Sequence, residues 1–482
     1  MRVTRTAQTS RHGTVPSMLY VSTRGEAPPL GFSDALLAGL ARDGGLYLPT
    51  EWPRIAPATI AGFAGRPFAE VAATVMAPFT GDDLPRPDLD TLLAATYRGF
   101  RHKAVAPLVQ IDDNLFILEL FHGPTLAFKD VAMQWLGRVM DNELRRRGRR
   151  ATIIGATSGD TGAAAIEAFA DLPQVDVFIL YPKGRVSDVQ RRQMTTCQAA
   201  NVHALAVEGT FDDCQSIIKG LFGHHEFADK HGLAGVNSIN WARIMAQVSY
   251  YFTSAVALGA PHRPVSFSVP TGNFGDVLAG YIAKRMGLPI ARLLVATNAN
   301  DILARTLATG HHDVRGVVAT QSPSMDIQIS SNFERLLFEA NGRDSAALRG
   351  QMAALAQGGA FSLTTGQLAA IRADFDGGSA DEAATTAEIA RTWRASGYVL
   401  DPHTAVAVKV AREGLSRDPA TPMVVLATAH PAKFPDAVKA ACGQDAALPG
   451  FMADLATRPE RTQVLAADLA VVERFIATHV RS

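Results

Sequence analysis

The feature that most constrains the fold is an alternation of short apolar segments with longer segments of helical character. The apolar segments, which we expect to be strands, are residues 114–121, 151–155, 175–181, 202–207, 265–269, 291–297 and 423–428. The segments of helical character are residues 130–147, 161–170, 186–194 and 211–224, with another from residue 276 onward. Short strands separated by helices are typical of βαβ units, so the sequence predicts an α/β fold built on open parallel sheets.

The alternation falls into two blocks, which predicts two α/β lobes. We expect a smaller lobe over residues 127–262 and a larger lobe made of residues 99–126 and 263–482. Residues 18–98 precede the first block and carry proline-rich breaks, so we expect an additional N-terminal domain there. Residues 1–17 are polar, with three arginines and no apolar core, which predicts a disordered extension, with a transit peptide as the weaker alternative.

Composition excludes several classes of function. Lysine plus arginine and aspartate plus glutamate both number 46, and this balance argues against a polyanion-binding protein. The three cysteines, Cys197, Cys214 and Cys442, form no CxxC motif, which excludes a disulfide framework and favours a reducing, cytoplasmic location. No apolar run is long enough for a membrane span and HExxH is absent, so we expect neither a membrane protein nor a metal site.

A glycine-rich turn, GATSGDTGAAA over residues 155–165, follows the apolar segment 151–155 and opens a helix. Unpaired N–H groups at a helix N-terminus carry partial positive charge, so such a turn can bind anions. The hydroxyl groups of Thr157, Ser158 and Thr161 add hydrogen-bond donors. The turn lacks the Walker lysine and the GxGxxG spacing, and a plain strand-to-helix connection explains it equally well.

A second turn of the same kind, PTGNFGDVLAG over residues 270–280, follows the strand candidate 265–269. Gly272 and Gly275 permit close backbone approach, and Asn273 can donate a side-chain hydrogen bond. Two anion-type turns in two α/β lobes indicate either two phosphate groups or one ligand held between the lobes.

One lysine stands where an amine could be activated. Lys129 lies in HGPTLAFKDVAMQWLGR, residues 122–138, where a strand-to-helix connection enters an apolar helix. Desolvation there would lower the lysine pKa and make the neutral amine available as a nucleophile. Position alone, however, favours an ordinary surface lysine at the start of a helix.

These three segments, in this order, resemble the threonine synthases, which are pyridoxal-phosphate enzymes of fold type II related to the tryptophan synthase β subunit. The resemblance runs from about residue 18 to beyond residue 430 and covers most of the chain. The matching segments are MLYVSTRG (18–25), DGGLYLP (43–49), FHGPTLAFKD (121–130), ATSGDTG (156–162), YPKGRVSDVQRRQMTT (181–196), NSINWAR (237–243), PTGNFGD (270–276), SPSMDIQISSNFERLLFE (322–339), DPHTAVA (401–407) and ATAHPAKF (427–434). Together they fit the longer, unregulated class of the family.

The resemblance implies a set of site residues. Lys129 is similar to the lysine that bonds to the cofactor, and Thr428 to the hydroxyl residue facing the pyridine nitrogen. Asp160 stands where relatives place an asparagine near the cofactor's 3-hydroxyl, and Trp241 where a proline is common. The residues matching the cofactor-phosphate loop are Gly272, Asn273, Phe274, Gly275 and Asp276. The residues matching the substrate-phosphate positions are Thr157, Ser158, Thr161, Asn237, Ser238 and Arg243.

The resemblance also implies a lyase reaction of threonine biosynthesis, in which O-phospho-L-homoserine and water give L-threonine and phosphate. Pyridoxal phosphate would be the electron sink, and a second phosphate site accounts for Arg243. A phospho-lyase that yields 2-oxobutyrate and ammonia, a hydroxy-amino-acid dehydratase and a catalytically silent binding protein stay open as alternatives. We expect a cytoplasmic monomer or dimer that binds neither nucleic acid nor a membrane.

Overall fold

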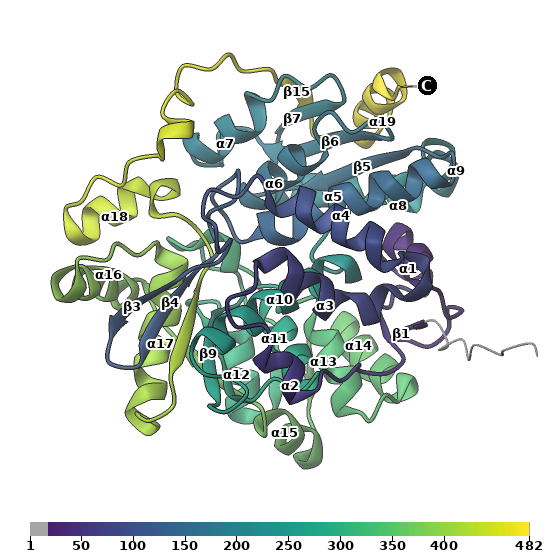
Figure 1. Cartoon of the computed structure of the whole chain (residues 1–482). Coiled ribbons are helices and arrows are strands. Elements are labelled where there is room, and N and C mark those ends of the chain that lie inside the picture. Colours follow the sequence, from purple (N-terminus) through teal and green to yellow (C-terminus); the bar gives the residue numbers. More distant parts are fainter. Residues whose placement is uncertain (1–17, 482) are drawn as a thin grey trace, which may run out of the picture.

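Two predominantly parallel sheets organise the computed structural model, which describes residues 18–481 (Figure 1). One sheet has six strands and the other has five. The structure thus confirms the predicted α/β fold class with open parallel-sheet lobes and additional N-terminal elements. The extension predicted over residues 1–17 lies outside the described residues.

The six-stranded sheet has the order β13-β10-β9-β14-β4-β3. Its strands are β3 (Leu108–Asp112), β4 (Leu115–Glu119), β9 (Val265–Pro270), β10 (Ile290–Thr297), β13 (Phe375–Ser379) and β14 (Met423–Ala427). β3 pairs antiparallel with β4 at one edge, and the other neighbours pair in parallel. Every residue of β9 and β14 is buried, as the unbroken apolar runs of central parallel strands require.

The five-stranded sheet has the order β15-β7-β6-β5-β8 and is parallel throughout. Its strands are β5 (Ala151–Ala156), β6 (Val175–Pro182), β7 (Val202–Glu208), β8 (Leu233–Gly235) and β15 (Gln463–Ala466). Residues 263–482 were assigned as a whole to the larger lobe, but β15 pairs with β7 of this smaller sheet. Helix α19 (Leu469–His479) follows it and buries Val472 and Ile476 against α8 (Phe211–Gly223).

Helices cover both faces of each sheet, and one hydrophobic core is shared between the sheets. The helices of this shared core are α5 (Lys129–Arg146), α6 (Asp160–Phe169), α10 (Trp241–Ala257) and α11 (Gly275–Arg285). α16 (Glu382–Ser396) and α17 (Pro402–Arg417) pack on the other face of the six-stranded sheet. The shared core brings the carboxyl ends of strands from both sheets toward the same central region.

The N-terminal elements pack on this shared core (Figure 1). They are β1 (Tyr20–Ser22), α1 (Phe32–Ala38), β2 (Tyr47–Pro49), α2 (Pro57–Ala61), α3 (Phe68–Thr80), η1 (Gly81–Asp83) and α4 (Arg86–Tyr97). α3 contacts α10 and α4 contacts α5, so these elements pack against two helices of the shared core.

The remaining elements complete the loops and edges of the two lobes. They are α7 (Asp188–Thr195), α9 (His225–His231), α12 (Ile302–Thr309), β11 (His311–Asp313), η2 (Pro323–Met325), α13 (Phe333–Ala340), α14 (Ser345–Gly358), β12 (Ala360–Ser362), α15 (Thr365–Arg372), η3 (Pro431–Lys433), α18 (Pro435–Cys442) and η4 (Gly450–Met452). Among residues 18–481, no helix has the length and apolar content needed to cross a bilayer.

Candidate active site

The predicted lysine lies in the interior, against the expectation from its position alone. Lys129 is the first residue of α5 and its side chain is only 10% exposed. Its Nζ lies 3.5 Å from Oδ2 of Asp160, the first residue of α6. Two of the sequence-predicted site residues from different segments therefore meet at a buried ion pair.

A second lysine, which the sequence interpretation did not single out, completes this cluster. Lys433 of η3 is fully buried, and its Nζ lies 2.6 Å from Oδ1 of Asp160. The same Nζ donates a hydrogen bond of 2.9 Å to the carbonyl oxygen of Thr125. Gln190 also donates to Oδ1 of Asp160, at 2.9 Å. The only sequence signal for Lys433 was its place in the matching segment ATAHPAKF.

The pKa values of this cluster are set by burial and by neighbouring charges. Burial lowers the pKa of Lys129; Asp160 opposes that shift, while Lys433 and Arg243 add to it. Burial would raise the pKa of Asp160, but the two lysine ammonium groups outweigh it and hold that pKa well below its usual range. Asp160 is therefore ionised, whereas Lys129 is shifted toward the neutral amine that can act as a nucleophile.

The turn over residues 272–276 presents free hydrogen-bond donors. Among residues 18–481, none of its five backbone N–H groups has a protein acceptor. Phe274 has a left-handed backbone, with φ of 65°, and its ring packs between Phe333 and Phe375. Ser330 donates from Oγ to the carbonyl oxygen of Gly272 and so fixes the start of the turn. A row of N–H groups at the N-terminus of α11 fits a bound phosphate.

Asp276 belongs to the same turn but carries less charge than its position suggests. Its side chain is buried, and this burial raises its pKa to about 7, although Lys129 acts in the opposite direction. Near neutral pH a large share of Asp276 is therefore protonated. The turn consequently repels an anion less than an ionised aspartate would.

The turn over residues 157–161 is partly filled by its own side chain. Oγ1 of Thr157 accepts hydrogen bonds from the N–H groups of Gly159 and Gly162, each at 2.9 Å. Thr157 is buried, Ser158 is exposed and Thr161 is half-buried. Thr157 thus shapes the turn, while Ser158 and Thr161 are the members that solvent or a ligand can reach.

Arg243 is a buried cation without an acidic partner among the described residues. Its side chain is on α10, and Nη1 donates to the carbonyl oxygen of Val236 at 3.0 Å. Its Nε has no hydrogen-bond partner within residues 18–481. Burial alone lowers its pKa to about 10, so it still carries a proton at neutral pH. An unpaired buried guanidinium is costly unless a ligand supplies an anion.

The other residues of the NSINWAR segment divide into exposed and structural positions. Asn237 is exposed and Ser238 is half-buried. Trp241 opens α10 and its ring packs against Tyr20 and Phe79. The tryptophan at this position therefore belongs to the aromatic packing that holds α10 to the N-terminal elements.

Asn332 links two of the predicted segments, and the sequence interpretation did not identify it. Its Nδ2 donates to the carbonyl oxygens of Ser238, at 3.2 Å, and of Asn273, at 3.1 Å. Arg335, one turn further along the chain in α13, donates to Oδ1 of Asn332 and to the carbonyl oxygen of Ile239. The NSINWAR segment and the turn over residues 272–276 are thus joined by one side-chain amide.

Thr428 lies beside the lysine. It follows β14, and its carbonyl oxygen accepts a hydrogen bond of 2.9 Å from the N–H of Phe128, the residue before Lys129. Ala127 and Ala429, the neighbours of Phe128 and Thr428, form an antiparallel bridge next to this hydrogen bond. The end of β14 is therefore held against the segment that carries Lys129.

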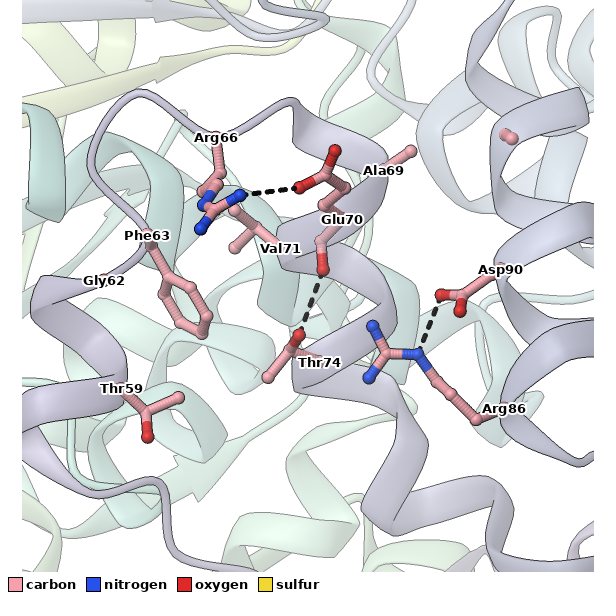
Figure 2. A pocket seen from close by; sticks show the side chains of 11 residues that line it. Thr59, Gly62, Phe63, Arg66, Ala69, Glu70, Val71, Thr74, Arg86 and Asp90 are labelled. Atoms are coloured by element: carbon pink, nitrogen blue, oxygen red, sulfur yellow. Dashed lines mark hydrogen bonds and ion pairs between the residues drawn. The ribbon is translucent and has the colours of Figure 1, made fainter.

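A surface hollow elsewhere lacks the features of a catalytic site. A cavity of about 630 Å³ lies among α2, α3 and α4 of the N-terminal elements (Figure 2). The charged side chains there pair with one another, Arg66 with Glu70 at 3.7 Å and Arg86 with Asp90 at 2.8 Å. These four charges thus neutralise each other, in contrast to the buried Arg243.

Three family models match segments of the chain between residues 19 and 476. A family model described as "Threonine synthase N terminus" matches residues 19–97, "Pyridoxal-phosphate dependent enzyme" matches residues 100–429, and "Threonine synthase, C-terminal" matches residues 404–476. The second of these spans more than half of the chain and covers both glycine-rich turns and Lys129.

Individual relatives agree with the family models. A threonine synthase of Pseudomonas aeruginosa is 52% identical over 463 residues, covering 96% of this chain and 98% of that protein. A crystal structure of threonine synthase from Brucella melitensis with bound pyridoxal phosphate has a TM-score of 0.94 and 61% identity, covering 97% of this chain and all of that one. A yeast threonine synthase structure has a TM-score of 0.91 and 41% identity, covering 96% and 99%. The chain therefore belongs to the threonine synthase family of pyridoxal-phosphate-dependent enzymes.

Proposed function

We propose that the protein converts O-phospho-L-homoserine and water to L-threonine and phosphate. The observation that carries this proposal is Arg243, a buried guanidinium with no acidic partner within residues 18–481, in the neighbourhood of Lys129. A substrate with its own phosphate would supply the missing anion. Membership of the threonine synthase family favours threonine formation over the phospho-lyase and dehydratase alternatives.

The residues present fit the cofactor. The free N–H groups of residues 272–276 would bind its phosphate, and Lys129 would hold it covalently. We further propose that the Thr428 hydroxyl faces the ring nitrogen and that Asp160 lies near the 3-hydroxyl, from the resemblance of these positions to the family. When bound, pyridoxal phosphate supplies an electron sink for carbanion chemistry at the carbon that bears the substrate amino group.

The substrate phosphate is proposed to lie between Arg243 and the turn over residues 157–161. Arg243 would make charge-assisted hydrogen bonds to the phosphate as the carbon–oxygen bond breaks. We keep Ser158, Thr161, Asn237 and Ser238 as proposed contacts, since each has at least a partly accessible side chain. Thr157 is proposed to act through the shape of the turn, because its Oγ1 already accepts two backbone hydrogen bonds.

Lys129 is the proposed proton carrier of the reaction. Its lowered pKa permits Nζ to accept a proton from substrate carbon and to return it. Burial of the side chain excludes bulk water from this nitrogen, so the proton is delivered locally.

Chromatography of the products tests the proposal. Purified protein with pyridoxal phosphate and O-phospho-L-homoserine should release threonine and phosphate in equal amounts, and Lys129→Ala should release neither. Formation of 2-oxobutyrate and ammonia in place of threonine would overturn the assignment. A cytoplasmic location and a monomeric or dimeric state stay predictions. The three cysteines form no disulfide in the structure.

A further inference from the structure

Lys433 occupies a position that the proposed reaction does not use. It lies on η3, between β14 and α18, and its side chain is fully buried. Burying an ammonium group is costly unless the group is paired and hydrogen-bonded. Here the partners are Oδ1 of Asp160, at 2.6 Å, and the carbonyl oxygen of Thr125, at 2.9 Å.

Asp160 is shared unequally by two lysines. Its Oδ1 contacts Lys433 at 2.6 Å, whereas its Oδ2 contacts Lys129 at 3.5 Å. The closer pair makes the stronger electrostatic interaction, because the energy falls with distance. Gln190 donates to Oδ1 as well, so the carboxylate is held on the Lys433 side.

This asymmetry matters because Lys129 must be able to lose its charge. An amine attacks a carbonyl carbon only in its neutral form, and a lysine that moves protons must give up and regain one. If Lys129 were the only cation beside Asp160, its deprotonation would leave a buried, uncompensated carboxylate. Such an arrangement would hold Lys129 in the ammonium form.

We propose that Lys433 is a positioning residue that acts as the permanent counter-ion of Asp160, so that the Lys129 nitrogen can lose and regain a proton while Asp160 stays ionised. The inference rests on the proposed function only in taking Lys129 as the lysine that carries the cofactor. Lys433 itself acts on Lys129 through Asp160 and through its own charge.

The direction of each effect follows from the charged groups around the two lysines. Lys129 faces Asp160 on α6, Lys433 on η3, Arg243 on α10 and Asp276 on α11. Removing Lys433 takes away a positive charge and leaves Asp160 to Lys129 alone, which stabilises the protonated Lys129 nitrogen. Removing the charge of Asp160 destabilises the protonated nitrogen, since Lys433 and Arg243 remain.

Lys433 has titratable neighbours besides Asp160. Asp130 and His430 lie within range of its charge, on α5 and immediately before η3. The carboxylate of Asp130 already accepts two hydrogen bonds from Thr125, at 2.7 and 2.8 Å. Asp130 is therefore held by Thr125, and Asp160 is the carboxylate that Lys433 contacts directly.

A pH titration of the substrate-free holoenzyme tests the proposal. The visible absorbance of bound pyridoxal phosphate reports the protonation of the Lys129 nitrogen to which it is attached. Lys433→Met should move the titration midpoint to higher pH and Asp160→Asn should move it to lower pH, each by about one unit or more. The double variant should return toward the wild-type midpoint, because both charges of the pair are removed together.

Opposite shifts distinguish this role from a merely structural one, which would weaken cofactor binding in both variants without moving their midpoints apart. Midpoints that stay at the wild-type value, or that shift in the same direction, would overturn the proposal. If Lys433→Met does not fold, Lys433→Gln is judged by the same criterion. Lys439→Met is the matched control: this lysine of α18 is 64% exposed and pairs with Asp445, and its replacement should leave the titration unchanged.

The titration uses no substrate, so its outcome is separate from the product assay. The titration midpoints of the two single variants could shift in opposite directions while the wild-type enzyme forms no threonine. That result would overturn the proposed function and leave the role of Lys433 standing. If the wild-type enzyme forms threonine but the midpoints of the two single variants do not separate, the proposed function stands and the role given to Lys433 is wrong.

Discussion

The two glycine-rich turns have the same construction but different chemistry. Each follows a parallel strand, β5 or β9, and each opens a helix with an aspartate in its first turn. In the glycine-rich turn after β5, the hydroxyl oxygen of Thr157 accepts hydrogen bonds from the backbone N–H groups of Gly159 and Gly162. In the second, the N–H groups of residues 272–276 have no acceptor among residues 18–481. Similar sequence patterns therefore leave different numbers of donors for a ligand.

The aspartates differ in charge as well. Asp160 is kept ionised by Lys433 and Lys129, whereas burial raises the pKa of Asp276 to about 7. The second turn can thus receive a phosphate through its backbone alone, with little opposing charge. The first turn holds an ionised carboxylate and needs the guanidinium of Arg243 to attract an anion. This contrast supports the proposed division between cofactor phosphate and substrate phosphate.

The largest expected effect concerns the charge of the second turn. A folded-state pKa of about 7 for Asp276 lies above the unfolded value of about 3.9, so the folded protein retains a proton that the unfolded chain has released. Wild-type stability should therefore fall as pH rises from about 4 to 7, by up to about 4 kcal/mol from this group. Asp276→Asn should remove that pH-dependent decrease.

Thermal unfolding of the cofactor-free protein at several pH values measures this effect. The difference in Tm between Asp276→Asn and wild type should grow as pH rises from 4 to 8. Asp88→Asn, which removes an exposed acid from the first turn of α4, should show no such growth. A constant Tm difference across the range would mean that Asp276 is ionised like Asp160, and the contrast between the turns would disappear.

The next effect separates the two phosphate sites kinetically. Arg243→Ala should lower kcat/KM for O-phospho-L-homoserine by about one to two orders of magnitude for each hydrogen bond removed, since charge-assisted hydrogen bonds contribute about 1.5–3 kcal/mol. Arg243→Lys keeps the charge without the two-pronged geometry and should fall between the alanine variant and wild type. Cofactor absorbance should be normal in both. Release of pyridoxal phosphate with unchanged kinetics would contradict the assignment.

A smaller effect tests whether Thr157 completes the first turn. Thr157→Val keeps the shape of the side chain but leaves the N–H groups of Gly159 and Gly162 without their acceptor. Unfolding in urea should show a decrease of about 1–3 kcal/mol in stability, the cost of unsatisfied buried groups. Thr157→Ser keeps the hydroxyl and should be destabilised much less. Equal stability of the valine and serine variants would refute the role given to Oγ1.

The smallest effect concerns access to the second turn. A Cβ at Gly275 would lie 3.5 Å from both Nδ2 of Asn332 and Cδ1 of Ile244, an ordinary van der Waals distance. Gly275→Ala should therefore be tolerated, whereas the branched side chain of Gly275→Val should displace the turn. We expect a roughly tenfold weaker affinity for pyridoxal phosphate in the valine variant, about 1.4 kcal/mol, measured by equilibrium dialysis. Unchanged affinity would show that this turn does not bind the cofactor.

The sequence predicts those strands and helices whose burial is evident from the hydrophobicity of their own residues. β9 and β14 appear as apolar runs because both faces of a central parallel strand are buried. The position of β15 could not be predicted in this way. Three of its four residues are exposed, and its place beside β7 depends on pairing across more than 250 residues of chain. The composition of the strand itself does not indicate which distant strand it pairs with.

The residues of the candidate site show the same difference between local and long-range features. The family motifs indicate Lys129 and the turn over residues 272–276, and the structure buries Lys129 together with residues 274–276 of that turn. Lys433 and Asn332 also lie in matching segments, but their roles depend on partners distant in the chain. Their hydrogen bonds join segments 308 residues apart for Lys433 with Thr125, and 94 apart for Asn332 with Ser238. Neither the burial of these two side chains nor their hydrogen-bond partners can be deduced from the neighbouring sequence.

Phe274 limits how the sequence of the second turn can vary during evolution. Its left-handed backbone favours glycine or asparagine, and a bulky residue held there costs on the order of 1–3 kcal/mol. Its ring, however, is buried between Phe333 and Phe375, and a small replacement would leave a cavity. No single substitution satisfies both the backbone and the packing. Variation at this position therefore requires compensating changes in the surrounding aromatic residues.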